Sequence, residues 1–156
     1  MIEVENINYI PVDLNYVMAN MQPMLVAHFA EAEHAFPDKA LQLNLDILTL
    51  LEQNDKLFVL VAIDTSIEKP IGYAAFTLDE SLIAKVTSAT ELGLYVTSEY
   101  RGLGVATELL LRSEIFLKER NVELIKMILK DKNKGLHSGI YDIGYELEEL
   151  GYYKRI

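Results

Sequence analysis

The segment from Thr90 to Arg120 constrains the fold more than any other part of the sequence. Residues 90–96 are apolar and favour a β-strand, residues 97–100 interrupt it, and a helical pattern follows from Leu103. The turn between strand and helix is nearly bare of side chains and reads Arg101-Gly102-Leu103-Gly104-Val105-Ala106. Because the first N–H groups of a helix have no partner within the helix, such a turn can hold a phosphate group against its backbone.

Further strand and helix patterns on both sides of this segment predict a mixed α/β fold. A strand pattern over residues 122–129 follows the helix, and this strand, helix and strand form a crossover with parallel strands. Seven apolar residues in a row, 57–63, predict a strand covered on both faces, and residues 71–78 close a hairpin with it. The other predicted strands are 2–9, 144–148 and 151–155, and the other predicted helices are 14–35 (divided at Pro23), 39–54 and 134–143. We expect a single domain, residues 1–156, with a central mixed sheet of about six to seven strands flanked by helices.

The composition excludes several kinds of site. The chain contains no cysteine, so it has no disulfide, no thiolate metal ligand and no thiol nucleophile. His28 and His34 lie six residues apart, which does not place them on one helix stripe, so we expect no metal site. No apolar run approaches the ~20 residues of a membrane-spanning helix, and the N-terminus lacks a secretion-signal pattern. We therefore expect a cytoplasmic protein.

The charge is strongly acidic, with 24 acidic and 14 basic residues and a formal net charge of −10. Such a surface repels nucleic-acid phosphates and anionic membranes, and it favours cationic ligands. We therefore expect neither nucleic acid nor a membrane as a partner. Acidity that only keeps the protein soluble explains the same composition, so the charge identifies no particular ligand.

The turn pattern Arg101-x-x-Gly104-x-Ala106, directly after a strand and at the start of a helix, resembles the coenzyme A pyrophosphate loop of the GNAT superfamily of N-acetyltransferases. The order of strands and helices is also similar to the GNAT fold from end to end. The resemblance implies acetyl-CoA as cosubstrate and direct transfer of its acetyl group, in a ternary complex, to a primary amine. The implied acceptor is a small cation such as a polyamine or an aminoglycoside, or a protein amino group.

The resemblance also implies which residues bind the coenzyme. The backbone of the turn would hold the pyrophosphate, and the strand before it would offer backbone groups to the pantetheine arm and the acetyl oxygen. Arg101 has two interpretations: its side chain contacts a coenzyme phosphate, or it leaves the site while the N–H groups of the turn bind. The implied residues are Leu94, Tyr95, Val96, Arg101, Gly102, Leu103, Gly104, Val105, Ala106, Thr107 and Asn133.

Glu91 is the candidate general base. An alkylammonium with a pKa of ~10 is almost wholly protonated at neutral pH, so a base must expose its lone pair, directly or through water. Glu91 lies near the start of the strand before the turn, where similar proteins carry a catalytic or water-ordering glutamate. The alternative is that Glu91 only ends a strand in solvent.

The leaving thiolate also needs a proton or a hydrogen bond, which the family usually supplies from a tyrosine on a late helix. The family pattern is Asn, six residues, Tyr, three residues, Gly and an aromatic residue. Here Asn133 and Gly144 keep the outer spacing, but the tyrosine position falls on Ile140. Tyr141 follows one residue later, which turns its side chain by about 100° on a helix. We name Tyr141 as the candidate acid and His137 as the second candidate, with an ordinary core or surface aromatic as the alternative for Tyr141.

The end of the first helical segment, residues 31–38, carries several acids before a proline. In the resembling family the loop at this place lines the acceptor site, so these acids could attract a cation, although a solvated helix end explains them equally well. Two other functions stay open: a non-catalytic relative that binds acetyl-CoA, and an acidic interaction protein with a disused loop. The sequence identifies neither the acceptor nor the oligomeric state, and a homodimer is left open.

Overall fold

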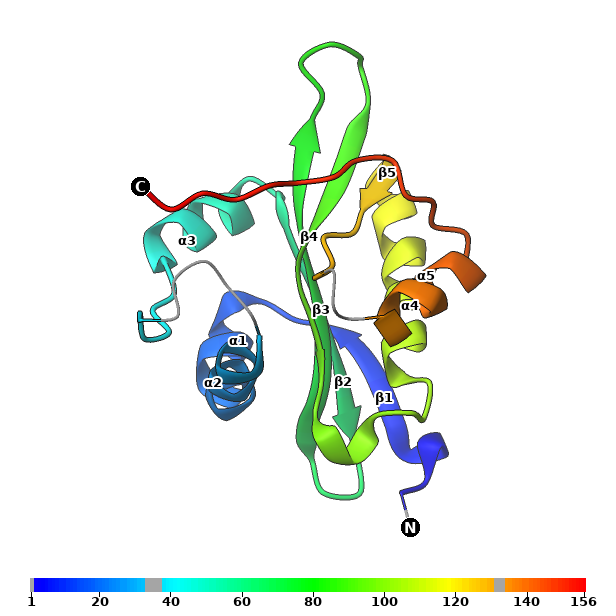
Figure 1. Cartoon of the computed structure of the whole chain (residues 1–156). Helices are drawn as coiled ribbons and strands as arrows, with labels where there is room; N and C mark the ends of the chain where they lie inside the picture. Colours follow the sequence, from blue (N-terminus) through cyan, green and yellow to red (C-terminus); the bar gives the residue numbers. More distant parts are fainter. Residues whose placement is uncertain (1, 33–37, 131–133) are drawn as a thin grey trace.

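The computed structural model describes residues 2–32, 38–130 and 134–156, which form a mixed sheet with helices on both faces (Figure 1). In this part of the chain the sheet has five strands in the order β1-β2-β3-β4-β5. The strands are β1 (Ile7–Pro11), β2 (Leu57–Asp64), β3 (Lys69–Glu80), β4 (Thr87–Val96) and β5 (Val122–Lys126). The helices are α1 (Leu14–Asn20), α2 (Gln22–Glu31), α3 (Leu45–Gln53), α4 (Val105–Glu119) and α5 (Lys134–Asp142), with short 3-10 turns at Val4–Asn6 and Ser98–Tyr100. Neighbouring strands are antiparallel except β4 and β5, which are parallel as the crossover pattern predicted.

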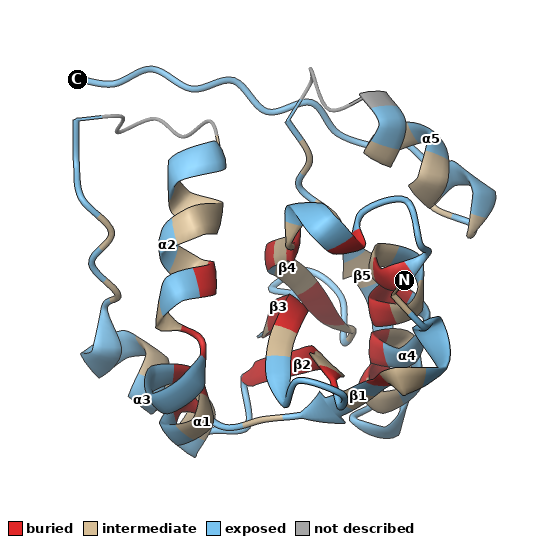
Figure 2. Cartoon of the chain, turned by 90° about the horizontal axis from the view of Figure 1, so that it is seen from below, coloured by how far each residue is buried: buried red, intermediate tan, exposed pale blue. Residues whose placement is uncertain are grey.

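The sheet separates two apolar cores. Helices α1 and α2 cover one face and α4 covers the other (Figure 1). Phe76 and Leu109 are fully buried on the α4 side, whereas Met21 and Val61 are buried on the side of α1 and α2. The strand β2 is buried along almost its whole length because both of its faces are covered, which confirms the prediction for residues 57–63. Figure 2 shows the same concentration of buried residues in the strands and along α4.

Local capping decides where the helices begin. Pro23 lies in the first turn of α2, where a missing N–H costs nothing, and it divides the 14–35 segment as predicted. The helix predicted over 39–54 begins only at Leu45, so the predicted start is wrong. Asn44 sets the true start, because its side chain accepts a hydrogen bond from the N–H of Ile47 at 3.3 Å.

The sheet is smaller than predicted at both ends of the chain. The first strand begins at Ile7 rather than residue 2, and it contains Pro11, which an edge strand tolerates. The strands predicted at 144–148 and 151–155 are wrong: residues 145–156 have no regular secondary structure. This tail makes contacts outside the sheet, since Arg155 pairs with Asp38 and Lys130 lies 5.6 Å from the centroid of the Tyr153 ring. The alternating pattern of the tail therefore does not lead to pairing with β5.

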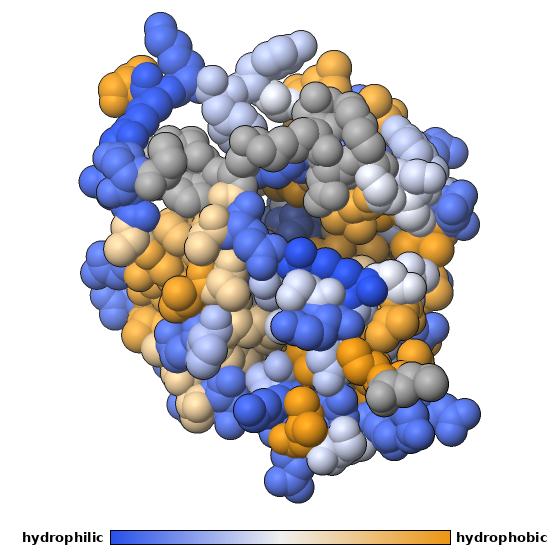
Figure 3. Space-filling model, turned by 60° about the horizontal axis from the view of Figure 1, so that its bottom comes forward, coloured by the Kyte–Doolittle hydropathy of each residue, from blue (hydrophilic) through white to orange (hydrophobic). Residues whose placement is uncertain are grey.

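None of the helices in the described residues combines the length and the apolar content needed to cross a bilayer. The face shown in Figure 3 mixes hydrophilic and hydrophobic residues. The long β3–β4 hairpin projects from the sheet (Figure 1), and Leu82 and Ile83 at its tip are fully exposed.

Candidate active site

The strands β4 and β5 separate halfway along β4. They pair only from Thr87 to Thr90, and beyond that point β4 is paired with β3 alone in the described part of the chain. A bulge marks the change, because Glu91 lies opposite Phe76 and Gly93 opposite the preceding residue of β3, which leaves Leu92 as the extra residue. Apart from the Val96 carbonyl oxygen, which accepts from Arg101, the backbone groups of residues 91–96 that point away from β3 are thus available to another molecule.

The glycine turn follows directly at the end of this open edge. Gly102 and Gly104 have φ values of +78° and +81°, which are left-handed conformations that favour glycine. A Cβ added at either position would meet nothing within 4 Å, so the space above the turn is open. Gly104 is the N-cap of α4, and the N–H groups of the first helical turn face this space without partners inside the helix. The turn therefore has the geometry and partial positive charge that suit a phosphate group.

A buried hydrogen bond anchors the turn to the sheet. The Tyr100 hydroxyl donates to Asp64 at the end of β2 over 2.6 Å, and both residues are buried. The same carboxylate accepts from the Ser66 hydroxyl at 2.6 Å, and these hydrogen bonds lower the pKa of Asp64. The turn is held in place by contacts that do not occupy the space above it.

The Arg101 side chain turns away from the open space and toward α2. Its Nε donates to the Val96 carbonyl oxygen at 2.8 Å, and its Nη2 lies 2.6 Å from Glu31 Oε2. The guanidinium also lies over the Tyr95 ring, 5.3 Å from the centroid. Of the two interpretations of Arg101, this geometry matches the one in which the side chain leaves the loop.

Glu91 lies at the point where β4 leaves β5. Burial raises the pKa of its carboxyl to about 7, although the N–H of Ile128 and the charge of Lys130 act in the opposite direction. A carboxyl with this pKa can accept and release a proton near neutral pH. The residue is half-buried rather than solvated at a strand end.

A cluster that the sequence analysis missed lies on the α2 side of β4. His28 Nδ1 is 2.6 Å from the Tyr73 hydroxyl, and the imidazole stacks on Tyr95 with centroids 4.8 Å apart. The Tyr95 hydroxyl donates to Glu31 Oε1 at 2.8 Å. Sequence signals for it existed. His28 and Glu31 are three residues apart on α2, and on each of β3 and β4 a tyrosine lies two residues from a small residue and therefore on the same face of the strand.

The candidate acids near the end of the chain, Tyr141 and His137, have surroundings that do not favour a role in the site. Tyr141 on α5 has 48% of its side chain exposed, whereas Ile140 packs against the core on the α4 side. His137 has its Nε2 3.0 Å from the Lys130 carbonyl oxygen. Asn133 lies outside the described residues. The inward-facing position that the family gives to tyrosine is thus occupied by an aliphatic side chain.

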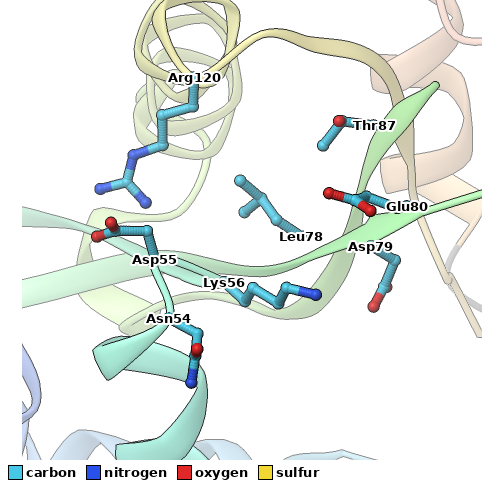
Figure 4. Close-up of a pocket in the computed structure, with 8 residues that line it drawn as sticks. All are labelled: Asn54, Asp55, Lys56, Leu78, Asp79, Glu80, Thr87 and Arg120. Atoms are coloured by element: carbon cyan, nitrogen blue, oxygen red, sulfur yellow. The ribbon is translucent and has the colours of Figure 1, made fainter. Parts of the chain in front are cut away.

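A separate open cavity lies at the opposite end of α4. It has a volume of about 490 Å³ and is lined by both cations and anions (Figure 4). Lys56 and Arg120 lie in it near Asp55 and Glu80, and Arg120 already donates to the Leu57 carbonyl oxygen at 3.2 Å. The described residues contain no group of three or more potential ligands that could hold a metal ion. The glycine turn and the open edge of β4, rather than this cavity, form the candidate site.

Comparisons with known proteins agree with this assignment. A sequence model described as the acetyltransferase (GNAT) family matches residues 21–138. No curated protein sequence matches the chain significantly.

Solved structures share the fold over nearly the whole chain. An aminoglycoside acetyltransferase from an uncultured soil metagenomic sample is similar with a TM-score of 0.78 and 14% identity, covering 98% of each chain. A transcriptional regulator from Bacillus halodurans C-125 gives 0.76 and 15%, covering 96% of this chain and 99% of the other. A ribosomal-protein-alanine N-acetyltransferase from Brucella melitensis biovar Abortus 2308 gives 0.70 and 17%, covering 96% and 99%. At these identities the similarity is one of fold.

Proposed function

Because the chain belongs to the GNAT acetyltransferase family, we propose that it is an N-acetyltransferase that moves the acetyl group of acetyl-CoA directly to a primary amine. The predicted GNAT fold is confirmed, with five strands in the described residues instead of six or seven. The observation that carries the proposal is the open, left-handed glycine turn at the start of α4, placed next to the unpaired edge of β4. These two features suit the two ends of an acylated coenzyme.

The coenzyme half of the proposed site uses mainly backbone. The N–H groups from Gly102 to Thr107 would hold the pyrophosphate, as at other helix N-termini that bind anions. Leu94, Tyr95 and Val96 are proposed to line the pantetheine arm, which would be hydrogen-bonded by those of their backbone groups that point away from β3, except the Val96 carbonyl oxygen, which accepts from Arg101. Asn133 is proposed for the same arm. A donor from this edge would also stabilise the negative charge that develops on the acetyl oxygen.

The chemical half of the proposed site relies on Glu91. Its carboxyl, with a pKa of about 7, is ionised to a useful extent at neutral pH and would take a proton from the incoming ammonium. The amine nitrogen then attacks the acetyl carbon, and coenzyme A leaves as a thiolate. Tyr141 stays a prediction for the group that protonates this thiolate, and its exposure on α5 weighs against that role.

The acceptor is proposed only as a primary amine. The net charge of −10 favours a cation over an anion, and it applies equally to a polyamine, an aminoglycoside or a protein amino group. The structural neighbours include an aminoglycoside acetyltransferase and a ribosomal-protein-alanine N-acetyltransferase, so the shared fold accommodates both kinds of acceptor. A non-catalytic relative that binds acetyl-CoA is the second candidate, because an isoleucine faces inward where the family places its tyrosine acid.

Two measurements test the proposal. Calorimetric titration with acetyl-CoA should show saturable binding, and an acidic interaction protein with a disused loop would show none. Release of the coenzyme thiol should then depend on an added amine, tested with a polyamine, an aminoglycoside and a peptide with a free α-amino group. Binding without amine-dependent thiol release would favour the non-catalytic relative.

A further inference from the structure

Tyr73 places a buried hydroxyl against the backbone of β4 at Gly93. Tyr73 pairs across the strands with Tyr95, yet its hydroxyl oxygen lies 2.8 Å from the point where a Cβ on residue 93 would stand. Any side chain at residue 93 would therefore displace the tyrosine. Gly93 follows the bulge at Leu92, in the part of β4 that has left β5. The hydroxyl thus lies over the open stretch of β4, on the face covered by α2.

His28 holds the same hydroxyl from the helix side. Its Nδ1 lies 2.6 Å from the Tyr73 oxygen, and the two rings meet edge to face with centroids 5.6 Å apart. The imidazole also stacks on Tyr95 at an interplanar angle of 20°. Two ring contacts from neighbouring strands therefore fix the orientation in which Nδ1 faces Tyr73.

The groups that surround this pair keep both members uncharged near neutral pH. The titratable and charged groups that face the pair are Glu31 of α2, Glu91 and Tyr95 of β4, and Arg101 of the turn. Burial lowers the pKa of His28, with Glu31 opposing this effect and Arg101 adding to it. Burial, with the nearby Glu91 charge, raises the pKa of Tyr73. In the tautomer of neutral His28 that carries its proton on Nε2, the Tyr73 hydroxyl donates to Nδ1, which leaves its oxygen lone pairs free to accept.

Acylation of an ammonium releases two protons from its nitrogen. The nitrogen carries three protons as an alkylammonium and one as a secondary amide, so it loses one proton before attack and another afterwards. Glu91 can hold one of them at a time. While Glu91 holds the first proton, the second one goes to the leaving thiolate or to another group near the splayed part of β4, and Tyr73 with His28 provides a polar pair at that place.

We propose, on the basis of the acetyl transfer proposed above, that Tyr73 is a catalytic residue whose hydroxyl accepts the second proton of the acceptor nitrogen while it donates its own proton to His28. His28 is then the positioning residue of Tyr73 and the end of a two-member proton relay. Gly93 is also part of the proposed arrangement, because any side chain at this position would collide with the Tyr73 hydroxyl.

The step balances without another reactant. The bond between the amine nitrogen and the acetyl carbon has formed, the carbon–sulfur bond breaks, and its electron pair leaves on the coenzyme thiolate. The nitrogen proton moves to the Tyr73 oxygen as the Tyr73 proton moves to Nδ1 of His28. The resulting imidazolium and thiolate carry opposite charges until each exchanges a proton with water.

Two variants of the full chain test the relay. Tyr73→Phe removes only the hydroxyl, and we expect kcat to fall about a hundredfold, the usual scale of one proton-transfer group. His28→Asn keeps a hydrogen-bonding atom near the position of Nδ1 but cannot take a proton, and we expect a similar fall. Acetyl-CoA affinity by calorimetry should stay within about twofold in both variants, because the proposed pyrophosphate contacts come from backbone N–H groups of the turn and neither variant changes that backbone.

The pH profile separates a relay from a structural role. In the natural protein both Glu91 and His28 must be unprotonated for turnover. In a plot of log kcat against pH, the curve should therefore fall with a slope of one below pH 7, where Glu91 becomes protonated, and with a slope of two at lower pH, where His28 is protonated as well. His28→Asn should keep a slope of one throughout. Tyr9→Phe is the matched control, because it removes a buried hydroxyl without a partner among the described residues, and its kcat should not change.

The outcomes distinguish this inference from the proposed function. If the natural protein releases no thiol with any of the amines, the proposed function fails and the relay fails with it. If the natural protein is active and Tyr73→Phe keeps more than half of its kcat, only the relay is overturned. If log kcat of His28→Asn still falls with a slope of two at low pH, the relay is overturned as well.

Discussion

The guanidinium of Arg101 and the carboxylate of Glu31 lie 2.6 Å apart and join the glycine turn to helix α2. The other oxygen of the same carboxylate accepts from the Tyr95 hydroxyl at 2.8 Å. These contacts lower the pKa of Glu31 and raise that of Arg101. One carboxylate therefore connects the proposed coenzyme side of the site with the helix on its acceptor side.

This contact predicts a small role for the Arg101 side chain in coenzyme binding. We expect Arg101→Gln to weaken acetyl-CoA binding by less than about tenfold, which is 1.4 kcal/mol. The reason is that the guanidinium is held by Glu31 and the Val96 carbonyl and does not face the open space above the turn. Calorimetric titration measures the effect, and a hundredfold loss would show that the side chain grips a phosphate.

Glu31→Gln is the control for this interpretation. Both side chains of the pair are about half exposed, at 47% and 48%, so each single variant should change the unfolding free energy only slightly. A double-mutant cycle on thermal or denaturant unfolding gives the coupling between them. If Arg101→Gln and Glu31→Gln change the coenzyme affinity equally, the effect comes from loss of the Arg101–Glu31 ion pair and not from a direct contact between Arg101 and a coenzyme phosphate.

Gly104 is expected to be far more sensitive than Arg101. Gly104→Val forces a branched side chain into a left-handed conformation and fills the open space above the turn, so acetyl-CoA binding should be lost. Gly144→Val is the matched control, because Gly144 has a φ of +97° and equally open surroundings but lies after α5. Both variants should lose about 1–2 kcal/mol of stability, and only Gly104→Val should lose binding in the calorimeter. Retained affinity in Gly104→Val would remove the turn from the site.

The sequence predicted those parts of the fold that depend on local pattern. The apolar run 57–63 can only be buried on both faces, and the strand, bare turn and helix from Thr90 to Arg120 leave one topology for their crossover. The helix divided at Pro23 follows from the missing N–H of proline. In each case residues close in sequence determine the outcome.

Long-range contacts explain what the sequence did not predict. His28 and Tyr73 are 45 residues apart, and Glu31 and Tyr95 are 64 apart, so their hydrogen bonds exist only after α2 packs on the sheet. The tail 145–156 shows the opposite error: its alternation suits a strand, but it lies outside the sheet and contacts residues such as Asp38. A local pattern does not contain either kind of information.

Tyr141 can be tested against its position on α5. We expect Tyr141→Phe to change kcat by less than about threefold, because Tyr141 is 48% exposed and the neighbouring Ile140, not Tyr141, packs against the core on the α4 side. A proton donor to the thiolate would instead contribute on the order of a hundredfold. Steady-state rates of thiol release at several pH values provide the measurement, and a large fall in kcat would establish Tyr141 as the acid.

Glu91 provides the pH dependence of the proposed reaction. Turnover should rise with pH and level off above about 7, where the carboxylate is the main form. Glu91→Gln should lower kcat by about a hundredfold or more and leave acetyl-CoA affinity nearly unchanged. Unchanged turnover across the pH range would remove Glu91 from the mechanism.

The same carboxyl should leave a signature in stability that does not require any substrate. Burial raises its pKa from 4.5 to about 7 on folding, so between these values the unfolded chain has released the proton and the folded chain has not. The contribution of Glu91 is therefore fully present below pH 4.5, declines as the pH rises, and is lost above about 7. This rise in pKa corresponds to about 3 kcal/mol of unfolding free energy. Denaturant unfolding of the natural protein and Glu91→Gln should show the variant gaining up to this amount between pH 4.5 and 8, because glutamine keeps the shape of the buried side chain and never ionises. A constant difference between the two proteins over that range would mean that Glu91 is solvated, as at an ordinary strand end.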